Sequence, residues 1–287
     1  MKDIQELLKA SIINLDKPRY TDSHNITSKI GKMLNVKIGH AGTLDPAVTG
    51  VLPVFIGKST RLSQYFLEDK EYEGIMHIHQ EIPIKKVREM IKKKFLGKIK
   101  QIPPSRSAVK KQEREREIYS FKIKKVKGRE KAIYFHVHCQ SGTYIRKLVH
   151  DLGEELGTGA HMQELRRTRD GILNEKTAVS FEKLEKAIEE YKKGNDKKLK
   201  KYLLPIEIIA KNMPKLIIKE QFIIKLQNGS PIFKKFIKSG KLNAKTKAGQ
   251  RIAILSEEKK LLEIARASSS EEREKDILAM PETVIII

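Results

Sequence analysis

The stretch IGHAGTLDPAVTGVLPV, residues 38–54, surrounds one acidic residue, Asp45, with three glycines: Gly39, Gly42 and Gly50. Glycine allows tight or left-handed backbone on both sides of this residue. Pro46 favours an extended conformation at Asp45 and so sets the direction of its carboxylate. The apolar run VLPVFI (51–56) predicts a buried strand, with Pro53 indicating its edge or its beginning. By composition alone, Asp45 fits an Asp-Pro turn as well as it fits a catalytic group.

The overall composition indicates a nucleic-acid partner. Lys and Arg number 59 against 36 Asp and Glu, a formal charge of +23, which attracts a polyanion such as nucleic acid or an anionic membrane. With 39% hydrophobic residues, the 287-residue chain can bury a core. No apolar run is long enough to span a bilayer, and no secretory signal is visible. Cys139 is the only cysteine, which excludes disulfides and Cys-based zinc sites and favours a reducing cytoplasmic location.

The hydrophobic periodicity predicts a mixed α+β chain. Residues 133–139 alternate as a strand, and 145–156 have helical spacing that ends at Gly157. The charged stretch 191–202 is interpreted as a surface connection. Beyond Pro205 short β-rich pieces follow, so we predict a first unit over 11–204, a second, mostly β module over 205–287, and an N-terminal extension over 1–10.

Several segments together resemble one family. GHAGTLDP followed by TG and an apolar strand closely resembles the signature of the TruB/dyskerin pseudouridine synthases. LDKP (15–18), KEY (70–72), QIPPSRSAVK (101–110) and SGTYIRKLVHDLGEELGTGAHMQELRRTRDG (141–171) match further blocks in the family's order. The resemblance implies a catalytic domain with a central, mostly antiparallel sheet flanked by helices, and a small β-barrel-like PUA domain on which the extension can pack.

The resemblance also implies the site. Asp45 would be the nucleophile, Arg146 would pair with it, and Tyr72 would stack on the flipped base. Leu165 would form part of the wall beneath the uracil, and His40 would fill the gap that the base leaves. Three further substrate-binding residues lie in the LDKP and GTYIR motifs: Lys17, Tyr144 and Ile145. Without the resemblance, Tyr72 and Leu165 would be interpreted as core residues and Arg146 as a surface residue.

The chemistry of uridine isomerisation suits these residue types. A nitrogen–carbon glycosidic bond is broken and replaced by a carbon–carbon bond, so neither redox cofactor nor metal is needed. The reaction does need an ionised carboxylate that attacks either the base or the sugar. In a dry pocket such a carboxylate tends to be protonated, and a paired guanidinium keeps it charged. We therefore expect Asp45 and Arg146 to form a buried pair.

Two histidine pairs raise the alternative of a metal site. His77 with His79, and His136 with His138 beside Cys139, each place two rings on one face of a predicted strand. No further cysteine or carboxylate stands at ligand spacing, so polar strand positions near RNA are the favoured interpretation.

Within the family, the segments SAVKKQEREREIYSF and GAHMQELRRTRDG resemble archaeal dyskerin homologues. This branch implies a box H/ACA guide RNA as partner, with three H/ACA proteins: a small zinc-ribbon type, a Gly/Arg-rich type and a kink-turn-binding type. Its substrate would be ribosomal RNA, with transfer RNA left open. Two alternatives remain at this point: a stand-alone synthase of the transfer-RNA T-loop, and a non-catalytic RNA-binding scaffold.

Overall fold

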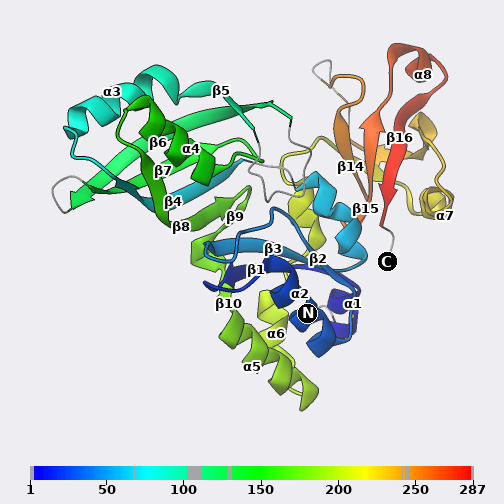
Figure 1. The fold of residues 1–287 in the computed structure, drawn as a ribbon. Helices are drawn as coiled ribbons and strands as arrows, with labels where there is room; N and C mark the ends of the chain where they lie inside the picture. Colours follow the sequence, from blue (N-terminus) through cyan, green and yellow to red (C-terminus); the bar gives the residue numbers. More distant parts are fainter. Residues whose placement is uncertain are drawn as a thin grey trace.

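The chain forms two β-sheets in a computed structural model that describes residues 3–66, 69–102, 112–127, 131–240, 242 and 246–285 (Figure 1). Most of the block QIPPSRSAVK lies outside these residues. In the described part of the chain, no helix is both long and apolar enough to cross a bilayer.

The larger sheet has the strand order β10-β1-β3-β8-β4-β7-β6-β5, with β2 added to β3 and β9 added to β8. Its strands are β1 (Ala10–Lys17), β2 (Ile38–His40), β3 (Thr49–Gly57), β4 (Lys70–Ile78), β5 (Gly97–Gln101), β6 (Arg114–Lys127), β7 (Ala132–Cys139), β8 (Ala160–Asp170), β9 (Leu173–Asn174) and β10 (Val179–Ser180). The β3–β8 and β1–β10 pairs are parallel and the others antiparallel. The predicted mostly antiparallel sheet is therefore confirmed.

Helices pack on this sheet and connect its strands: α1 (Ile4–Lys9), α2 (Ser23–Leu34), α3 (Ile84–Lys94), α4 (Ile145–Glu155), α5 (Phe181–Lys192) and α6 (Lys197–Tyr202). Three 3₁₀ segments join them: η1 (Lys58–Tyr65), η2 (Glu175–Thr177) and η3 (Ile206–Ala210). The Asp22 carboxylate caps α2 by accepting from two backbone N–H groups. The stretch 191–202 is not a plain connection, because burial of Leu199 holds its second half in α6.

Strand β3 is buried on both faces, which explains its nearly continuous apolar sequence. Leu52 and Val54 join the main core under the helices, whereas Val51 and Phe55 face the second sheet. Pro53 lies inside this strand, so the expectation of an edge or a beginning was wrong. On the side of β3 where the Pro53 carbonyl accepts from Ala41, β8 pairs with residues 49–50 and β2 with residues 54–56. Pro53 falls between these partners, where no ladder needs its missing N–H.

The second module is a six-stranded sheet with the order β12-β16-β15-β14-β11-β13, which fits a PUA-like domain (Figure 1). Its strands are β11 (Lys215–Ile218), β12 (Ile232–Phe233), β13 (Ile237–Ser239), β14 (Arg251–Leu255), β15 (Leu261–Ala267) and β16 (Ile277–Val284). Its short helices are η4 (Glu220–Phe222), α7 (Ile223–Gln227), η5 (Lys234–Phe236) and α8 (Ser270–Glu274). Glu263 on β15 is fully buried, and neither carboxylate oxygen has a hydrogen-bond partner among the residues that the structure describes. Burial raises its pKa to about 8.

The two sheets share an apolar interface. Residues of β1, β3 and η1 form one buried cluster with residues of β14 and β15. At its edge the Tyr65 hydroxyl bonds Thr283, and the Arg251 guanidinium lies 4.6 Å from the centre of the Tyr65 ring. Helix α1 instead buries Ile4 and Leu8, one helical turn apart, in the core of the larger sheet. Pairing with Glu258 raises the pKa of Lys260 in the second module, and Glu6 on the same helix is close enough to raise it further, so packing of the extension on the second module stays a prediction.

Candidate active site

The predicted nucleophile, Asp45, opens a tight turn between β2 and β3. The backbone N–H of Val48 donates to the Asp45 carbonyl at 2.9 Å, with Pro46 at the second position of the turn. The Asp-Pro turn and a catalytic carboxylate, two interpretations of Asp45 from the sequence, are therefore compatible with each other. They place the Asp45 side chain at the entrance to a strand that is rigid because it is buried on both faces.

Five hydrogen bonds to three residues hold the backbone of this loop on both sides of Asp45. The buried Ser23 hydroxyl donates to the Leu44 carbonyl at 2.9 Å and accepts from the Leu44 N–H at 3.0 Å. After the nucleophile, the Pro46 carbonyl accepts from the Tyr20 N–H at 2.7 Å and from the Lys17 ammonium at 3.3 Å. Before it, the Gly42 carbonyl accepts from the Arg167 guanidinium at 2.7 Å.

Arg167 belongs to a buried ionic group beneath the loop. Its guanidinium also donates to the Val51 carbonyl at 2.7 Å and lies 3.4 Å from the Asp170 carboxylate, which in turn bonds Lys70. All three charged side chains are at most 5% exposed. Gly42, at φ 62°, approaches this group so closely that a Cβ there would lie 2.9 Å from the guanidinium. The group thus ties the loop before Asp45 to the strand after it.

Arg146 pairs with Asp45, as the resemblance implies. The two residues are 101 positions apart in the chain, and the guanidinium Nη2 contacts the carboxylate Oδ2. The expectation of a water-poor cleft is not met, because the side chains are 53% and 51% exposed. An exposed pair of this kind contributes at most about 1 kcal/mol to stability, well below a buried pair. The pair therefore orients the carboxylate, and about half of each side chain is open to solvent.

The start of α4 sets the position of Arg146. The Gln101 side chain, which is buried, accepts from the Tyr144 N–H at 3.0 Å and donates to the Tyr144 carbonyl at 3.2 Å. The next residue, Ile145, is 3% exposed in the main core, and its predicted contact with substrate stays a prediction. The motif GTYIR therefore has a buried anchor in Ile145 and a polar side chain, Arg146, that reaches the site.

Tyr72 and Leu165 come from neighbouring strands, β4 and β8, and are 7% and 8% exposed. Burial raises the pKa of Tyr72, so its hydroxyl stays protonated. Both side chains belong to the main core cluster. They are thus core residues of the larger sheet, and a role against the base remains a prediction.

His40 ends β2 and is half-buried, with its Nδ1 buried and without a partner among the described residues. Burial lowers the pKa of His40, and the nearby His24 lowers it further. The ring is therefore neutral at physiological pH. A neutral ring suits stacking on bases better than pairing with phosphate, which agrees with the predicted role without testing it.

The side chain of Lys17 turns into the protein, and its predicted contact with substrate stays a prediction. Its side chain is fully buried, and its ammonium donates to the carbonyls of Pro18 at 2.9 Å, Thr21 at 2.6 Å and Pro46 at 3.3 Å. Burial lowers the pKa of Lys17, an effect that the nearby Asp22 and Asp45 oppose. Lys17 therefore acts as an internal cap for two loops of the site. The LDKP motif indicated that Lys17 belongs to the site, whereas only the fold shows that its side chain points into the protein.

The histidine pairs have other partners. His136 lies 3.2 Å from Glu71 and His138 contacts Asp69, while Arg169 donates to both carboxylates. Burial alone would raise the pKa of Asp69, but hydrogen bonds from Arg169 and His138 lower it to about 2. Cys139 is buried, and burial raises its thiol pKa to about 12.

The other pair, His77 and His79, packs beside His161, whose Nδ1 lies 2.9 Å from His79 Nε2. Burial lowers the pKa of His161, and the two neighbouring rings lower it further. Across the described ranges, no group of three or more His, Cys, Asp or Glu is arranged to hold a metal ion.

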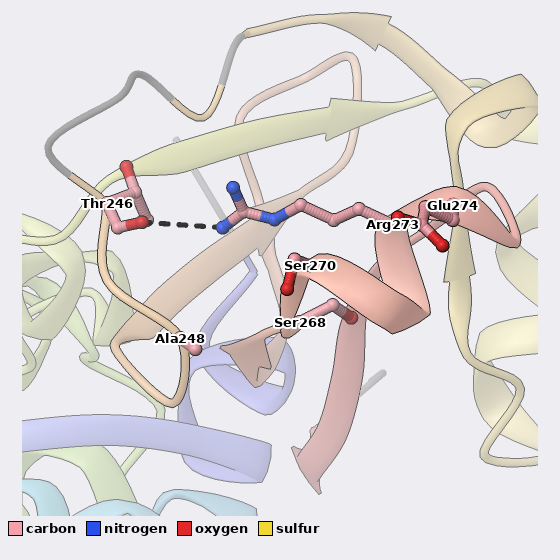
Figure 2. Close-up of a pocket in the computed structure, with 6 residues that line it drawn as sticks. All are labelled: Thr246, Ala248, Ser268, Ser270, Arg273 and Glu274. Atoms are coloured by element: carbon pink, nitrogen blue, oxygen red, sulfur yellow. Dashed lines mark hydrogen bonds between the residues drawn. The ribbon is translucent and has the colours of Figure 1, made fainter.

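Four positioning residues were missed from the sequence: Ser23, Gln101, Arg167 and Asp170. Ser23 and Gln101 are common polar residues whose burial no local pattern indicates. Gln101 opens the block QIPPSRSAVK, and Arg167 and Asp170 lie in the block 141–171, so these family blocks were the available signal for three of the four. A separate hollow of about 430 Å³ lies in the second module and contains no predicted site residue (Figure 2). There the Arg273 guanidinium extends to the Thr246 carbonyl at 3.3 Å.

Comparisons with known proteins agree with this geometry. The model of the TruB family pseudouridylate synthase N-terminal domain matches residues 31–145. That of the tRNA pseudouridylate synthase B C-terminal domain matches residues 146–211. A probable tRNA pseudouridine synthase B of Nanoarchaeum equitans is 40% identical over 278 residues, 96% of this chain and 78% of that protein. One of Korarchaeum cryptofilum is 39% identical over 267 residues, 91% of this chain and 80% of that protein.

Among solved structures, one described as a Cbf5-Nop10-Gar1 complex matches with a TM-score of 0.89 and 36% identity, over 99% of this chain and 88% of that chain. A second, an H/ACA RNP bound to a substrate RNA containing 2'-deoxyuridine, matches with a TM-score of 0.87 and 35% identity, over 100% of this chain and 88% of that chain. Sequence and structure together show that this chain belongs to the TruB family of pseudouridine synthases and has the fold of archaeal Cbf5 (dyskerin).

Proposed function

We propose that this chain isomerises uridine to pseudouridine in ribosomal RNA as the catalytic subunit of a box H/ACA particle, with Asp45 as its nucleophile. One observation carries the assignment of the nucleophile. Asp45 stands on a loop held from three directions, and its carboxylate meets the guanidinium of Arg146 from a distant segment. Half of each side chain is open to a ligand.

The proposed reaction uses the residues of the chain as follows. The Asp45 carboxylate forms a transient covalent bond with the base or the sugar, and the bond between N1 of uracil and C1' of ribose breaks. The uracil turns, a bond forms between its C5 and C1', and the bond to Asp45 breaks, which regenerates the carboxylate. C5 then loses its proton and N1 takes up one from solvent, so the product is an isomer of the substrate. Arg146 orients the carboxylate, and a base flipped from its stack covers both groups and excludes water.

In this proposal Tyr72 and Leu165 form the apolar floor of the pocket. The target base leaves its own stack at a cost of a few kcal/mol, and the neutral ring of His40 fills the gap. Tyr144, whose backbone Gln101 holds, is half-buried two residues before Arg146, and we include it as a contact to substrate. The reaction as written needs no cofactor.

Similarity to H/ACA complexes supports guidance by RNA. The matching structures contain Cbf5 with Nop10 and Gar1, or an H/ACA particle on a substrate RNA. We therefore propose a box H/ACA guide RNA as partner, together with H/ACA proteins of the small zinc-ribbon, Gly/Arg-rich and kink-turn-binding types. The PUA-like module and the net charge of +23 are consistent with extensive contacts to an RNA backbone.

A second candidate is a synthase that modifies transfer RNA without a guide. It is favoured by the names of the sequence relatives and by the match to the C-terminal domain of tRNA pseudouridine synthase B. The discriminating assay incubates the protein with transfer RNA alone, or with guide RNA, partner proteins and matched substrate. Product only in the second mixture supports guidance, product from bare transfer RNA supports the second candidate, and no product in either supports a non-catalytic scaffold.

Asp45→Asn tests the nucleophile. The substitution preserves shape and removes the charge, so pseudouridine formation should be abolished while RNA affinity stays within a few-fold of wild type. Asp151→Asn is the matched control, because Asp151 lies on α4 with Arg146 but pairs with Lys147 instead. Turnover by Asp45→Asn at the rate of the Asp151→Asn control would refute the assignment.

A further inference from the structure

Tyr20 is exposed in an unusual way beside the site. Its side chain is 78% exposed, more than any other large hydrophobic residue in the described part of the chain. Its φ of 61° lies in the left-handed region, which a bulky residue adopts only when its surroundings impose it. An aromatic ring held outward in a strained backbone gains no stability from the fold, so its placement is better explained by binding.

The turn that carries Tyr20 is rigid and joined to the loop of the nucleophile. The Tyr20 N–H donates to the carbonyl of Pro46, the residue directly after Asp45, at 2.7 Å. From inside, the Lys17 ammonium binds the carbonyls of Pro18 and Thr21, on either side of the tip. The backbone of Tyr20 is thus held at a fixed place relative to Asp45 before any ligand binds.

A second flat group lies against Tyr20. The Arg19 guanidinium carbon lies 5.2 Å from the centre of the Tyr20 ring, and the guanidinium pairs with Glu164 at 3.3 Å. Glu164 immediately precedes Leu165, so this contact ties the platform to the predicted floor of the pocket. Both Arg19 and Glu164 are partly exposed, at 38% and 51% of their side chains.

We propose that Tyr20 and Arg19 form a stacking platform for a nucleobase in the RNA strand that carries the target uridine. This inference rests on the proposed function and extends it to the neighbours of the target. A strand that presents a uridine to Asp45 must pass the adjoining turn. Aromatic faces and guanidinium planes stack on every base type, so the platform fits substrates of varied sequence. The charge of +23 and the contact with the nucleophile loop favour RNA over a protein partner.

The test uses the full chain, assembled with its matched guide RNA and partner proteins, and a substrate RNA with one uridine. Affinity is measured by fluorescence anisotropy, which requires no turnover. Tyr20→Gly removes the aromatic ring, and glycine adopts the left-handed φ without strain. Tyr20→Phe keeps the aromatic ring and the backbone strain and removes only the hydroxyl. The glycine variant should bind substrate about five- to 100-fold more weakly, the range that one stacked base supplies, and Tyr20→Phe within about twofold of wild type.

Two further measurements separate stacking from other effects. The first uses a substrate with an abasic nucleotide at one position beside the uridine. Wild type should bind this substrate more weakly than the intact one by the same factor, whereas the affinity of Tyr20→Gly should be the same for both substrates. The melting temperature of Tyr20→Gly should be equal to or above that of wild type, because glycine relieves the strain.

Three results would overturn the inference. The glycine variant binds substrate RNA as tightly as wild type, or the abasic substrate lowers the affinity of both proteins by the same factor. In the third, the variant no longer binds one of the partner proteins but keeps its affinity for RNA. Failure of the proposed function looks different, because wild type then forms no pseudouridine from any RNA although these affinities can still be compared.

Discussion

Gly42→Ala tests how the buried ionic group positions the nucleophile. A Cβ at this position would lie 2.9 Å from Arg167 Nη1, 3.1 Å from Asp170 Oδ2 and 3.3 Å from Lys70 Nζ. The φ of 62° adds strain, because an L-residue pays about 1–2 kcal/mol in the left-handed region. Shifting one member of a buried ion pair adds a further cost, below the roughly 3–5 kcal/mol of breaking it.

We expect the free energy of unfolding of Gly42→Ala to fall by roughly 2–4 kcal/mol, the sum of the strain and a partial displacement of the pair. Asp45 lies three residues further along the same loop, and a misplacement of about 1 Å at a reacting group costs up to about 100-fold in rate. Single-turnover rates should therefore drop about 10- to 100-fold under conditions where the variant is still folded.

Gly39→Ala is the matched control in the same motif. A Cβ there meets only Thr60, at 3.6 and 3.8 Å, which is ordinary contact, and its φ is not in the left-handed region. Its effect on unfolding, measured by chemical denaturation, should stay within about 1 kcal/mol. The reasoning fails if Gly42→Ala is as stable and as fast as Gly39→Ala.

Three further outcomes are expected. Lys17→Met removes the ammonium that binds the carbonyls of Pro18 and Thr21 and takes one of two donors from the Pro46 carbonyl, so the free energy of unfolding should fall by roughly 2–4 kcal/mol in denaturation experiments. A variant of normal stability but without activity would instead assign Lys17 to substrate binding. Arg146→Lys should change stability by less than about 1 kcal/mol but lower kcat about tenfold or more, since lysine lacks the planar fork; wild-type kcat would contradict this role. Burial raises the pKa of Glu263 to about 8, so the folded state keeps a proton that the unfolded state releases near pH 4.5, and stability should fall as pH rises between these values. Glu263→Gln should remove this loss of roughly 3–5 kcal/mol, and parallel pH profiles of the two proteins would show that the buried carboxyl does not titrate this way.

The sequence determined the elements and their chemistry because these depend on local pattern. The glycines and Pro46 around Asp45 predicted a loop before an apolar strand, and alternation over 133–139 predicted β7. The ordered motifs led to the family and to the pairing of Asp45 with Arg146, which the structure contains. Periodicity also separated the chain near Pro205 into units, although Leu204 still bridges Ile12 and the second sheet begins only at Lys215.

Tertiary structure alone decided where polar side chains point and how much water reaches them. Lys17 and Ile145 lie in motifs next to the site, yet their side chains turn into the protein, because a strand and a helix each direct one face inward. Conversely, the Asp45–Arg146 pair is open although its chemistry favours a dry pocket. Such directions depend on residues that are distant in the chain, such as Ser23, Gln101 and Arg167. Burial and hydrogen bonding between distant segments are properties of the packed molecule, and no local pattern encodes them.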